Sequence, residues 1–317
     1  MSGYNLCVID SILLARIRAR LEVALAAPLR THRPLLVEHQ VAGWVDDNRA
    51  TRLAEFTDVF SVRGDAVIFV SGIDTTDART TALNRVARSL AAEGRFSAWR
   101  NERYAVASEF GAQPWFLLER AAACFFGIQT YAVHINGLVR SVDGMAMWFA
   151  RRSPNKAIDP DRLDNLVGGG IAAGHSVADT VVKEAWEEAG IAASVAALAE
   201  PTGSVDICRE RPDGVQRETI FVRDLWLPVD FVPACQDAEV VDNRLVPLTE
   251  AARLVGNEAG RDLVTAEASL VVLDCLLRHG AIVPDIPEYA ALAALRHTAN
   301  RCAMRRRVPL IAPDSPV

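Results

Sequence analysis

The chain has 317 residues, 50% of them hydrophobic, which can bury a sizeable core in two domains or in one large one. This composition excludes disorder over most of the chain. The 34 basic and 40 acidic residues give a net charge of −6, so charge does not favour nucleic acid as a partner. No apolar stretch approaches the ~18 residues that a membrane-spanning helix needs, and we expect no membrane partner.

The cysteines and lysines narrow the class of protein further. The six cysteines lie far apart without a C-x-x-C pair, so we interpret them as buried thiols rather than a disulfide framework. They are Cys7, Cys124, Cys208, Cys235, Cys275 and Cys302. Reduced thiols make the cytoplasm the expected location. The basic residues are arginines except for Lys156 and Lys183, which makes these two positions worth following.

The region up to about residue 125 mixes helical and strand-like patterns. Residues 9–27 have the period of an amphipathic helix, and residues 39–45 are predicted to be a short connection into another helix at 50–56. Residues 66–72, "AVIFVSG", predict a buried strand, and residues 75–94 predict a helix with a Thr or Asp cap and Gly94 beyond its end. We therefore predict a smaller α+β domain of unknown role over residues 1–125.

A polar and aromatic cluster ends this region, in "WRNERYAVA". It contains Trp99, Arg100, Glu102 and Tyr104. We interpret it as a packed and capped junction between domains, and contact with a ring of the substrate is the alternative.

From residue 126 the pattern changes to strands around one central helix. Strand-like runs at 130–139 and 145–152 flank a hairpin loop, and "DNLVGGG" is a third short strand that runs into a glycine-rich loop. Residues 218–228 predict a long strand, and residues 265–280 a helix. This order predicts a mixed sheet between helices over residues 126–285. Residues 286–317 are predicted to be a C-terminal tail, and the Pro-rich end of its segment 299–317 is predicted to be peripheral.

The central stretch, "GGGIAAGHSVADTVVKEAWEEAGI", covers residues 168–191. Ser176 with Asp179 forms a capping-box pattern and Gly190 is a stop signal, so the helix is predicted to run from about 177 to 189. At 100° per residue, Val182, Ala185, Trp186 and Ala189 share an apolar stripe, and three glutamates share a largely opposite one. These glutamates are Glu184, Glu187 and Glu188.

The placement of the three glutamates is unfavourable for a helix selected only for stability. Glu184 and Glu188 repel each other at i,i+4 by roughly 0.2–0.5 kcal/mol, and acids in the last turn oppose the helix dipole. A hard divalent cation such as Mg²⁺ would relieve the repulsion, while Lys183 can orient a carboxylate. Next to them, Gly169 and Gly170 permit a close approach of backbone or phosphate. The combination predicts a metal-dependent hydrolase of a phosphate compound.

Two other motifs fit the glycine loop less well. "GGIAAGHS" is a P-loop pattern with His175 in place of the essential lysine. "GGGIAA" matches the dinucleotide fingerprint G-x-G-x-x-A, but the acids that should follow a second strand lie inside the helix. Both motifs are therefore disfavoured.

The same stretch resembles a Nudix box, G-x5-E-x7-R-E-U-x-E-E-x-G-U, where U is a bulky aliphatic residue. The spacing holds over 23 residues from Gly169 to Ile191, with His175 in place of the first glutamate, Lys183 in place of arginine and Ala185 in place of the first U. The resemblance implies a Nudix-type α/β/α sandwich with a mixed sheet and a site for Mg²⁺ or Mn²⁺. It further implies metal coordination by the three glutamates and catalytic roles for Glu187, Glu188 and Lys183.

The wider context, roughly residues 95–250, is similar to the Nudix group whose fungal members are fused to thiamine pyrophosphokinase. That group acts on thiamine diphosphate and its oxidised forms. Arg152 and Lys156 are then candidate diphosphate contacts, together with Gly169 and Gly170. Glu239 in "QDAEVVD" is a candidate further acid near the metal.

We therefore expect a pyrophosphohydrolase that converts a small diphosphate, thiamine diphosphate or a damaged analogue, to the monophosphate and phosphate. Hydrolysis of ADP-ribose or another nucleoside diphosphate derivative is the alternative. A second alternative is a Nudix-fold binding or sensor protein without turnover, which the changes at His175 and Lys183 motivate. A homodimer is compatible with these observations.

Overall fold

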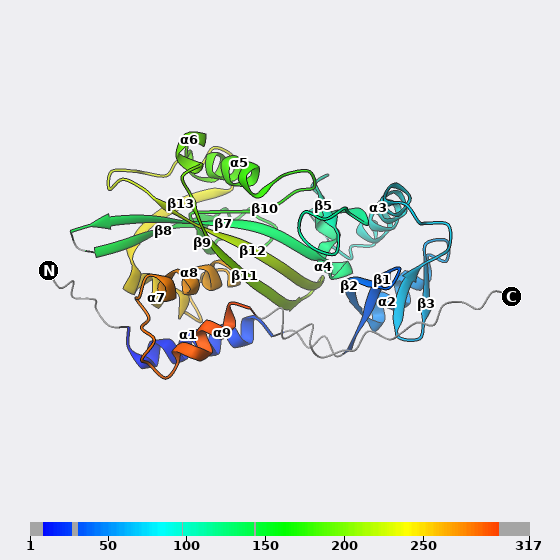
Figure 1. Ribbon diagram of the computed structural model, residues 1–317, viewed down its shortest axis with the longest axis horizontal. Coiled ribbons are helices and arrows are strands. Elements are labelled where there is room, and N and C mark those ends of the chain that lie inside the picture. Colours follow the sequence, from blue (N-terminus) through cyan, green and yellow to red (C-terminus); the bar gives the residue numbers. More distant parts are fainter. Residues whose placement is uncertain (1–8, 27–30, 97, 143, 298–317) are drawn as a thin grey trace.

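The computed structural model describes residues 9–26, 31–96, 98–142 and 144–297 (Figure 1). Two units lie side by side, a smaller one built from the first part of the chain and a larger one built around a long, twisted sheet. No helix in the described ranges is both long and apolar enough to span a membrane. Cys7, Cys302 and the last 20 residues of the predicted tail lie outside these ranges.

The smaller unit combines a mixed sheet with helices and a separate strand pair. Its elements are β1 (His32–Val37), β2 (Gln40–Asp46), α2 (Asp47–Ala54), β3 (Phe60–Arg63), β4 (Ala66–Phe69), α3 (Thr76–Ala92), β5 (Arg103–Val106), β6 (Phe116–Glu119), the 3-10 turn η2 (Arg120–Ala122) and α4 (Ala123–Phe126). One sheet has the order β2-β1-β4-β3, and β5 pairs with β6. The predicted strand at 66–72 is confirmed as β4, and α3 begins after Thr75, whose hydroxyl accepts a hydrogen bond from Ala78 N. Residues 39–45, predicted to be a connection, instead form most of β2, because apolar positions in this segment pack into the core of the unit.

The larger unit is built on a mixed sheet. Its strands are β7 (Gln129–Ser141), β8 (Gly144–Arg152), β9 (Leu163–Asn165), β10 (Val167–Gly170), β11 (Glu200–Arg211), β12 (Gly214–Trp226) and β13 (Val240–Pro247). The main order is β11-β12-β7-β8-β13, with β10 on β7 and β9 on β8. The β12–β7 pairing is parallel, whereas the other pairings are antiparallel.

Helices cover both faces of this sheet, so the predicted α/β/α sandwich is confirmed (Figure 1). The helices are α1 (Ser11–Ala24), α5 (Val177–Ala189), α6 (Ala193–Ala196), α7 (Leu248–Val255), α8 (Ala266–Arg278) and α9 (Tyr289–Leu295). Helices α5 and α6 pack on one face, and α7 and α8 pack on the other. Since side chains alternate along β7, Val133 and Ile135 face α5, whereas Ala132 and Leu138 face α8.

Helix α1 belongs structurally to the larger unit, although the sequence places it within the first 125 residues. Leu14, Ile17 and Leu21 are buried in the same apolar core as α7, α8 and α9. Helix α9 lies in that core too, so residues 289–295 of the predicted tail pack against the larger unit. The segment predicted to be peripheral, within residues 299–317, lies outside the described residues. The physical reason is that α8 is apolar and buried on almost all sides, and α1 and α9 both pack against it.

The two units are in close contact near the start of β12. A Cβ atom at Gly214 would lie 1.8 Å from the carbonyl oxygen of Cys124 in α4, so the backbones of the two units meet where only glycine fits. Trp44 of β2 packs against Cys208 and Val215 of the large sheet. These contacts hold the smaller unit in a defined position beside β10 and the glycine loop.

Candidate active site

The glycine strand β10 is lined on both sides by polar side chains. A Cβ atom at Gly169 would lie 2.3 Å from the carboxyl carbon of Glu184, and one at Gly170 would lie 2.3 Å from the hydroxyl of Tyr104. The glycines are therefore required because a carboxylate and a phenol occupy the space of their missing side chains. Tyr104 comes from β5, so the smaller unit reaches the glycine strand directly.

Helix α5 begins and ends where the sequence predicts. Ser176 and Asp179 form a reciprocal capping box, and Gly190 ends the helix in the left-handed conformation at φ 66°. The predicted faces are partly wrong. Trp186 is 52% exposed instead of packed, and Glu188 is buried at 6% exposure beside Ala185. The buried face is rotated because Glu188 turns inward to bind the backbone of β10.

Two of the three glutamates share one lysine. Lys183 Nζ donates to Glu184 Oε1 at 2.9 Å and to Glu187 Oε2 at 2.7 Å. Glu188 points elsewhere, and its Oε2 accepts a hydrogen bond of 2.8 Å from Gly168 N. These contacts agree with the predicted role of Lys183 in orienting the carboxylates. The lysine makes them at the position where the Nudix box has arginine.

These carboxylates lack enough positive charge around them. Burial raises the pKa of Glu188 to about 8, against the charge of Lys156 and the hydrogen bond from Gly168. Burial also raises the pKa of Glu184, against the opposing effect of Lys183. For Lys183 burial opposes the charged form, but the hydrogen bonds to Glu184 and Glu187 outweigh it and raise the pKa of the ammonium. A further cation would compensate this excess negative charge.

The donor set therefore fits a hard divalent cation, which prefers carboxylate oxygens. Glu184, Glu187 and Glu188 are the residues that would hold it. In the described structure Lys183 and Gly168 keep the three carboxylates apart, so a shared ion requires side-chain rotations in this array. The metal assignment of these glutamates stays a prediction.

The predicted diphosphate contacts lie near this array and already bind partners. Arg152 Nη1 bonds to Asp164 Oδ2 at 2.8 Å, and its other nitrogens donate to two backbone carbonyls. Lys156 forms an ion pair with Glu239, which also accepts a hydrogen bond of 3.2 Å from Arg100 Nη1. Glu239 is thus engaged by cations of both units, rather than placed as a free acid for a metal.

His175 lies in the loop before α5 and is exposed. Its backbone N–H donates to Ala172 O at 3.1 Å, and its side chain lines a hollow of about 490 Å³ together with Lys183 and Glu184. The residue is therefore beside the array but outside the helix that presents it, as the sequence predicts.

The structure adds residues that the sequence did not single out. A partly open space of about 160 Å³ adjoins the glycine strand and is lined by residues of both units, including Tyr104, Arg120 and His134. His134 Nδ1 lies 2.7 Å from Asn165 Oδ1, and its ring lies against Gly168. Arg120 carries no local motif, since it is one arginine in a helical turn, and only the fold brings it here.

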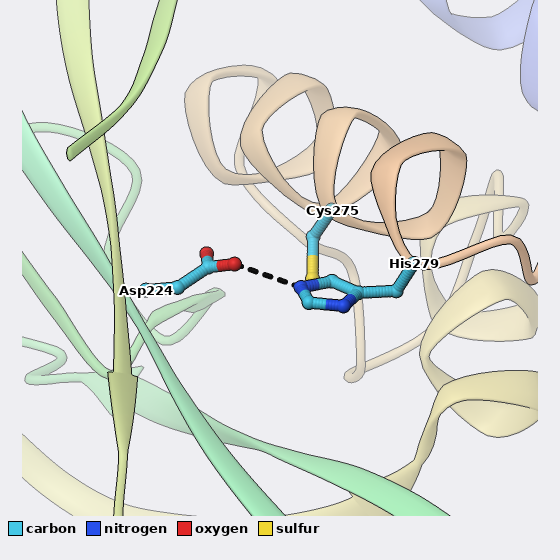
Figure 2. A group of neighbouring side chains, drawn as sticks. All are labelled: Asp224, Cys275 and His279. Atoms are coloured by element: carbon cyan, nitrogen blue, oxygen red, sulfur yellow. Dashed lines mark hydrogen bonds and ion pairs between the residues drawn. The ribbon is translucent and has the colours of Figure 1, made fainter. Parts of the chain in front are cut away.

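A second group of ligand-type side chains lies on the α8 face of the sheet (Figure 2). Among the described residues, Asp224, Cys275 and His279 are the ones whose ligand atoms all lie within 4.8 Å of one another. Asp224 is already bound, however. Its oxygens lie 2.6 and 2.9 Å from Arg278 nitrogens and 2.8 Å from His279 Nε2, and it accepts a hydrogen bond from Asn136. We interpret this group as a buried ion-pair network that stabilises the fold.

The fold and the carboxylate helix define a metal-dependent phosphohydrolase type of site, and comparison with known proteins identifies its family. A family model described as NUDIX domain matches residues 130–266, and one described as a domain of unknown function, DUF4743, matches residues 17–130. Nudix hydrolase 24, chloroplastic, of Arabidopsis thaliana is 37% identical over 261 residues, which are 82% of this chain and 71% of that protein. Nudix hydrolase 20, chloroplastic, of the same plant is 37% identical over 268 residues, again 82% and 71%.

The chain therefore belongs to the Nudix hydrolase family. It is a pyrophosphatase, and enzymes of this family generally use divalent metal ions. The crystal structure of DR0079 from Deinococcus radiodurans is 24% identical and covers 45% of this chain and 80% of its own, with a TM-score of 0.34.

Proposed function

We propose that this Nudix hydrolase converts thiamine diphosphate, or an oxidised form of it, to the monophosphate and inorganic phosphate. The observation that carries the hydrolysis is the array of Glu184, Glu187 and Glu188 around Lys183, next to the glycine strand. The thiamine substrate is supported by the similarity of residues 95–250 to the thiamine-related Nudix group, which extends into the smaller unit.

In this proposal the chain's own residues place and activate the reactants. Lys183 orients Glu184 and Glu187 through its hydrogen bonds, and Gly168 N–H orients Glu188. One of the three carboxylates accepts the proton of the attacking water. The oxygen of that water forms a bond to phosphorus, the anhydride P–O bond breaks, and the leaving oxygen stays with the other phosphate. A bound divalent cation supplies the Lewis acid that neutralises the phosphate oxygens and activates water.

A space that could receive the substrate lies beside the glycine strand. It is lined by Tyr104 and Arg120 of the smaller unit and by His134 of the sheet. A small diphosphate would enter this junction with its phosphates toward the carboxylate array. Arg152 and Lys156 line the neighbouring part of the junction, in keeping with their expected role as diphosphate contacts.

The proposal is tested by phosphate release from a panel of substrates with Mg²⁺ or Mn²⁺. The panel holds thiamine diphosphate, its oxidised analogues, ADP-ribose and nucleoside triphosphates. The highest kcat/KM is expected for a thiamine-type diphosphate, and a preference for ADP-ribose would replace the substrate assignment. Absence of turnover with every compound would favour the binding or sensor alternative.

The metal array is tested separately by Glu187→Gln, which keeps the size of the side chain and removes its charge. Phosphate release is expected to fall at least tenfold, while circular dichroism shows an unchanged fold. Unchanged turnover in both Glu187→Gln and Glu188→Gln would contradict the assignment of these glutamates to a metal site. The cytoplasmic location and the homodimer stay predictions, and light scattering of the purified chain tests the dimer.

A further inference from the structure

A strongly basic hollow lies where the smaller unit meets the Nudix unit. It has a volume of about 500 Å³. Its lining comes from residues 94–96, 98, 100, 120, 121 and 124 of the smaller unit and from residues 152, 156–158 and 211–213 of the larger one. Its described lining contains six basic side chains and one acidic one, Asp213. The basic ones are Arg95, Arg100, Arg120, Arg152, Lys156 and Arg211. The chain as a whole has a net charge of −6, so this local excess of positive charge favours binding of an anionic ligand.

The basic side chains of the hollow have fewer acidic partners than N–H donors, so some donors are available to a ligand. Arg100 and Lys156 share a single carboxylate, Glu239. Arg120 Nη1 donates a hydrogen bond of 2.7 Å to Glu102 Oε2, and the side chain of Arg120 is 40% exposed. Because a guanidinium has five N–H donors, one carboxylate can orient Arg120 while other donors bind a ligand.

The basic hollow is continuous with the space beside the glycine strand. Arg120, Arg152 and Arg211 line both. Charge also links the two, since Arg120 acts on Glu184 and Lys156 acts on Glu188. An anion held by these arginines would therefore lie next to a cation held by the glutamates.

The position of Arg120 relative to the catalytic helix is defined by packing between the units. Ala173 N in the glycine loop donates to Arg103 O at 2.7 Å, and Tyr104 fills the space beside Gly170. Arg120 directly follows β6, the strand that pairs with β5. Its backbone N–H donates a hydrogen bond of 2.8 Å to Glu102 O, just before β5. The basic hollow is therefore largely preformed, which lowers the cost of binding.

We propose that the smaller unit is part of the substrate site, and that its Arg120, with Arg100 on the same side and Arg211 and Lys156 opposite, binds the diphosphate group. The ligand class is an organic or inorganic diphosphate. This deepens the proposed function by giving the matched domain of unknown function a role in that same site. The binding step does not depend on hydrolysis.

The test is calorimetric titration of inorganic pyrophosphate into the full chain, with divalent metals removed by a chelator. Without a metal the carboxylate array repels the anion, so binding reports the basic hollow. Arg120→Gln is expected to weaken pyrophosphate binding at least tenfold, and Arg120→Lys is expected to weaken it less, because charge is kept but the planar fork is lost. Arg211→Gln, on the opposite wall, gives an independent variant with the same expected loss.

Two controls separate this inference from folding and from catalysis. Arg85→Gln removes an exposed arginine of α3 that pairs with Asp58, and it should leave pyrophosphate affinity within twofold. Glu187→Gln should abolish most turnover but keep metal-free binding. Equal affinity of wild type, Arg120→Gln and Arg211→Gln would overturn the inference, and so would no binding by wild type at millimolar pyrophosphate. Arginine-dependent binding without turnover of any substrate would support the inference and reject the proposed hydrolysis.

Discussion

Two groups of acidic side chains, on opposite faces of the large sheet, have opposite electrostatic character. Burial alone would raise the pKa of Asp224, but hydrogen bonds from His279, Arg278 and Asn136 outweigh it and hold that pKa well below its usual range. On the α5 face, burial raises the pKa of Glu184 and of Glu188, because their partners do not compensate it. The fully paired acid is a structural element, whereas the under-compensated acids mark a site for a cation.

The largest effect on stability is expected from removing the charge of Asp224, the fully paired acid. Asp224→Asn keeps the shape of the side chain but leaves Arg278 and His279 without their shared charge, so the free energy of unfolding should fall by about 3 kcal/mol. Urea unfolding at pH 7 measures the loss. Activity per folded molecule should remain, because Asp224 lines neither the space beside the glycine strand nor the basic hollow. Asp58→Asn, which removes an exposed partner of Arg85, is the control and should cost less than about 1 kcal/mol.

The same variant has a pH signature. Because the folded pKa of Asp224 lies below the unfolded value of about 3.9, its ionisation stabilises the fold above that pH. The stabilisation is lost as pH falls from about 4 through the lower folded pKa. The stability difference between wild type and Asp224→Asn should therefore shrink below about pH 4. A constant difference between pH 7 and pH 2 would contradict the pairing.

Substitution of a glutamate on the α5 face should have the opposite effect: activity is lost and stability is kept. Burial raises the pKa of Glu188 to about 8, so this carboxyl is largely neutral at pH 7. Glu188→Gln replaces it with a neutral amide that keeps an acceptor for Gly168 N–H, so the free energy of unfolding at pH 7 should not fall. Phosphate release should fall at least tenfold, which is about 1.4 kcal/mol or more in the barrier. Added Mg²⁺ should raise the Tm of wild type more than that of the variant. A clear loss of stability with retained turnover would place Glu188 in the structural class.

The smallest effect is expected at the position that departs from the Nudix box. His175 is exposed and lies before the helix, so His175→Glu should change kcat/KM by no more than about threefold. It should instead alter the preference for Mg²⁺ over Mn²⁺ or the pH profile of phosphate release. An inactive wild type that the substitution activates would show that three carboxylates are not sufficient.

Local patterns predicted the catalytic helix well. The bounds of α5, its capping box at Ser176 and its end at Gly190 are set by contacts within a few residues, which sequence spacing encodes directly. The sandwich followed from the order of strands and helices. The errors at Trp186 and Glu188 arose because helical period alone does not say which neighbour a face meets. Glu188 is buried where it bonds to Gly168, 20 positions earlier, whereas Trp186 is left 52% exposed by the part of the chain that the structure describes.

The other differences between the sequence-based predictions and the structure arise from contacts between elements far apart in the sequence. Helix α1 covers α8 although more than 240 residues separate them in sequence, and Arg20 Nη1 bonds to Val255 O at 2.6 Å and to Ser269 at 2.8 Å. Arg120 carries no motif, yet the fold brings it close enough to Tyr104 and Glu184 for their charges to affect one another. Such contacts depend on how whole elements pack, and no local pattern specifies them.

The sequence by itself determined the glycine strand, the carboxylate helix and the class of chemistry, because residue type and spacing within 24 positions specify them. Only the tertiary structure decided which acids are compensated. Asp224 obtains its partners from β7 and α8, whereas Glu184 and Glu188 obtain too few. The balance of burial against paired charge is a property of three-dimensional neighbours, and it is this balance that separates a structural ion network from a catalytic site.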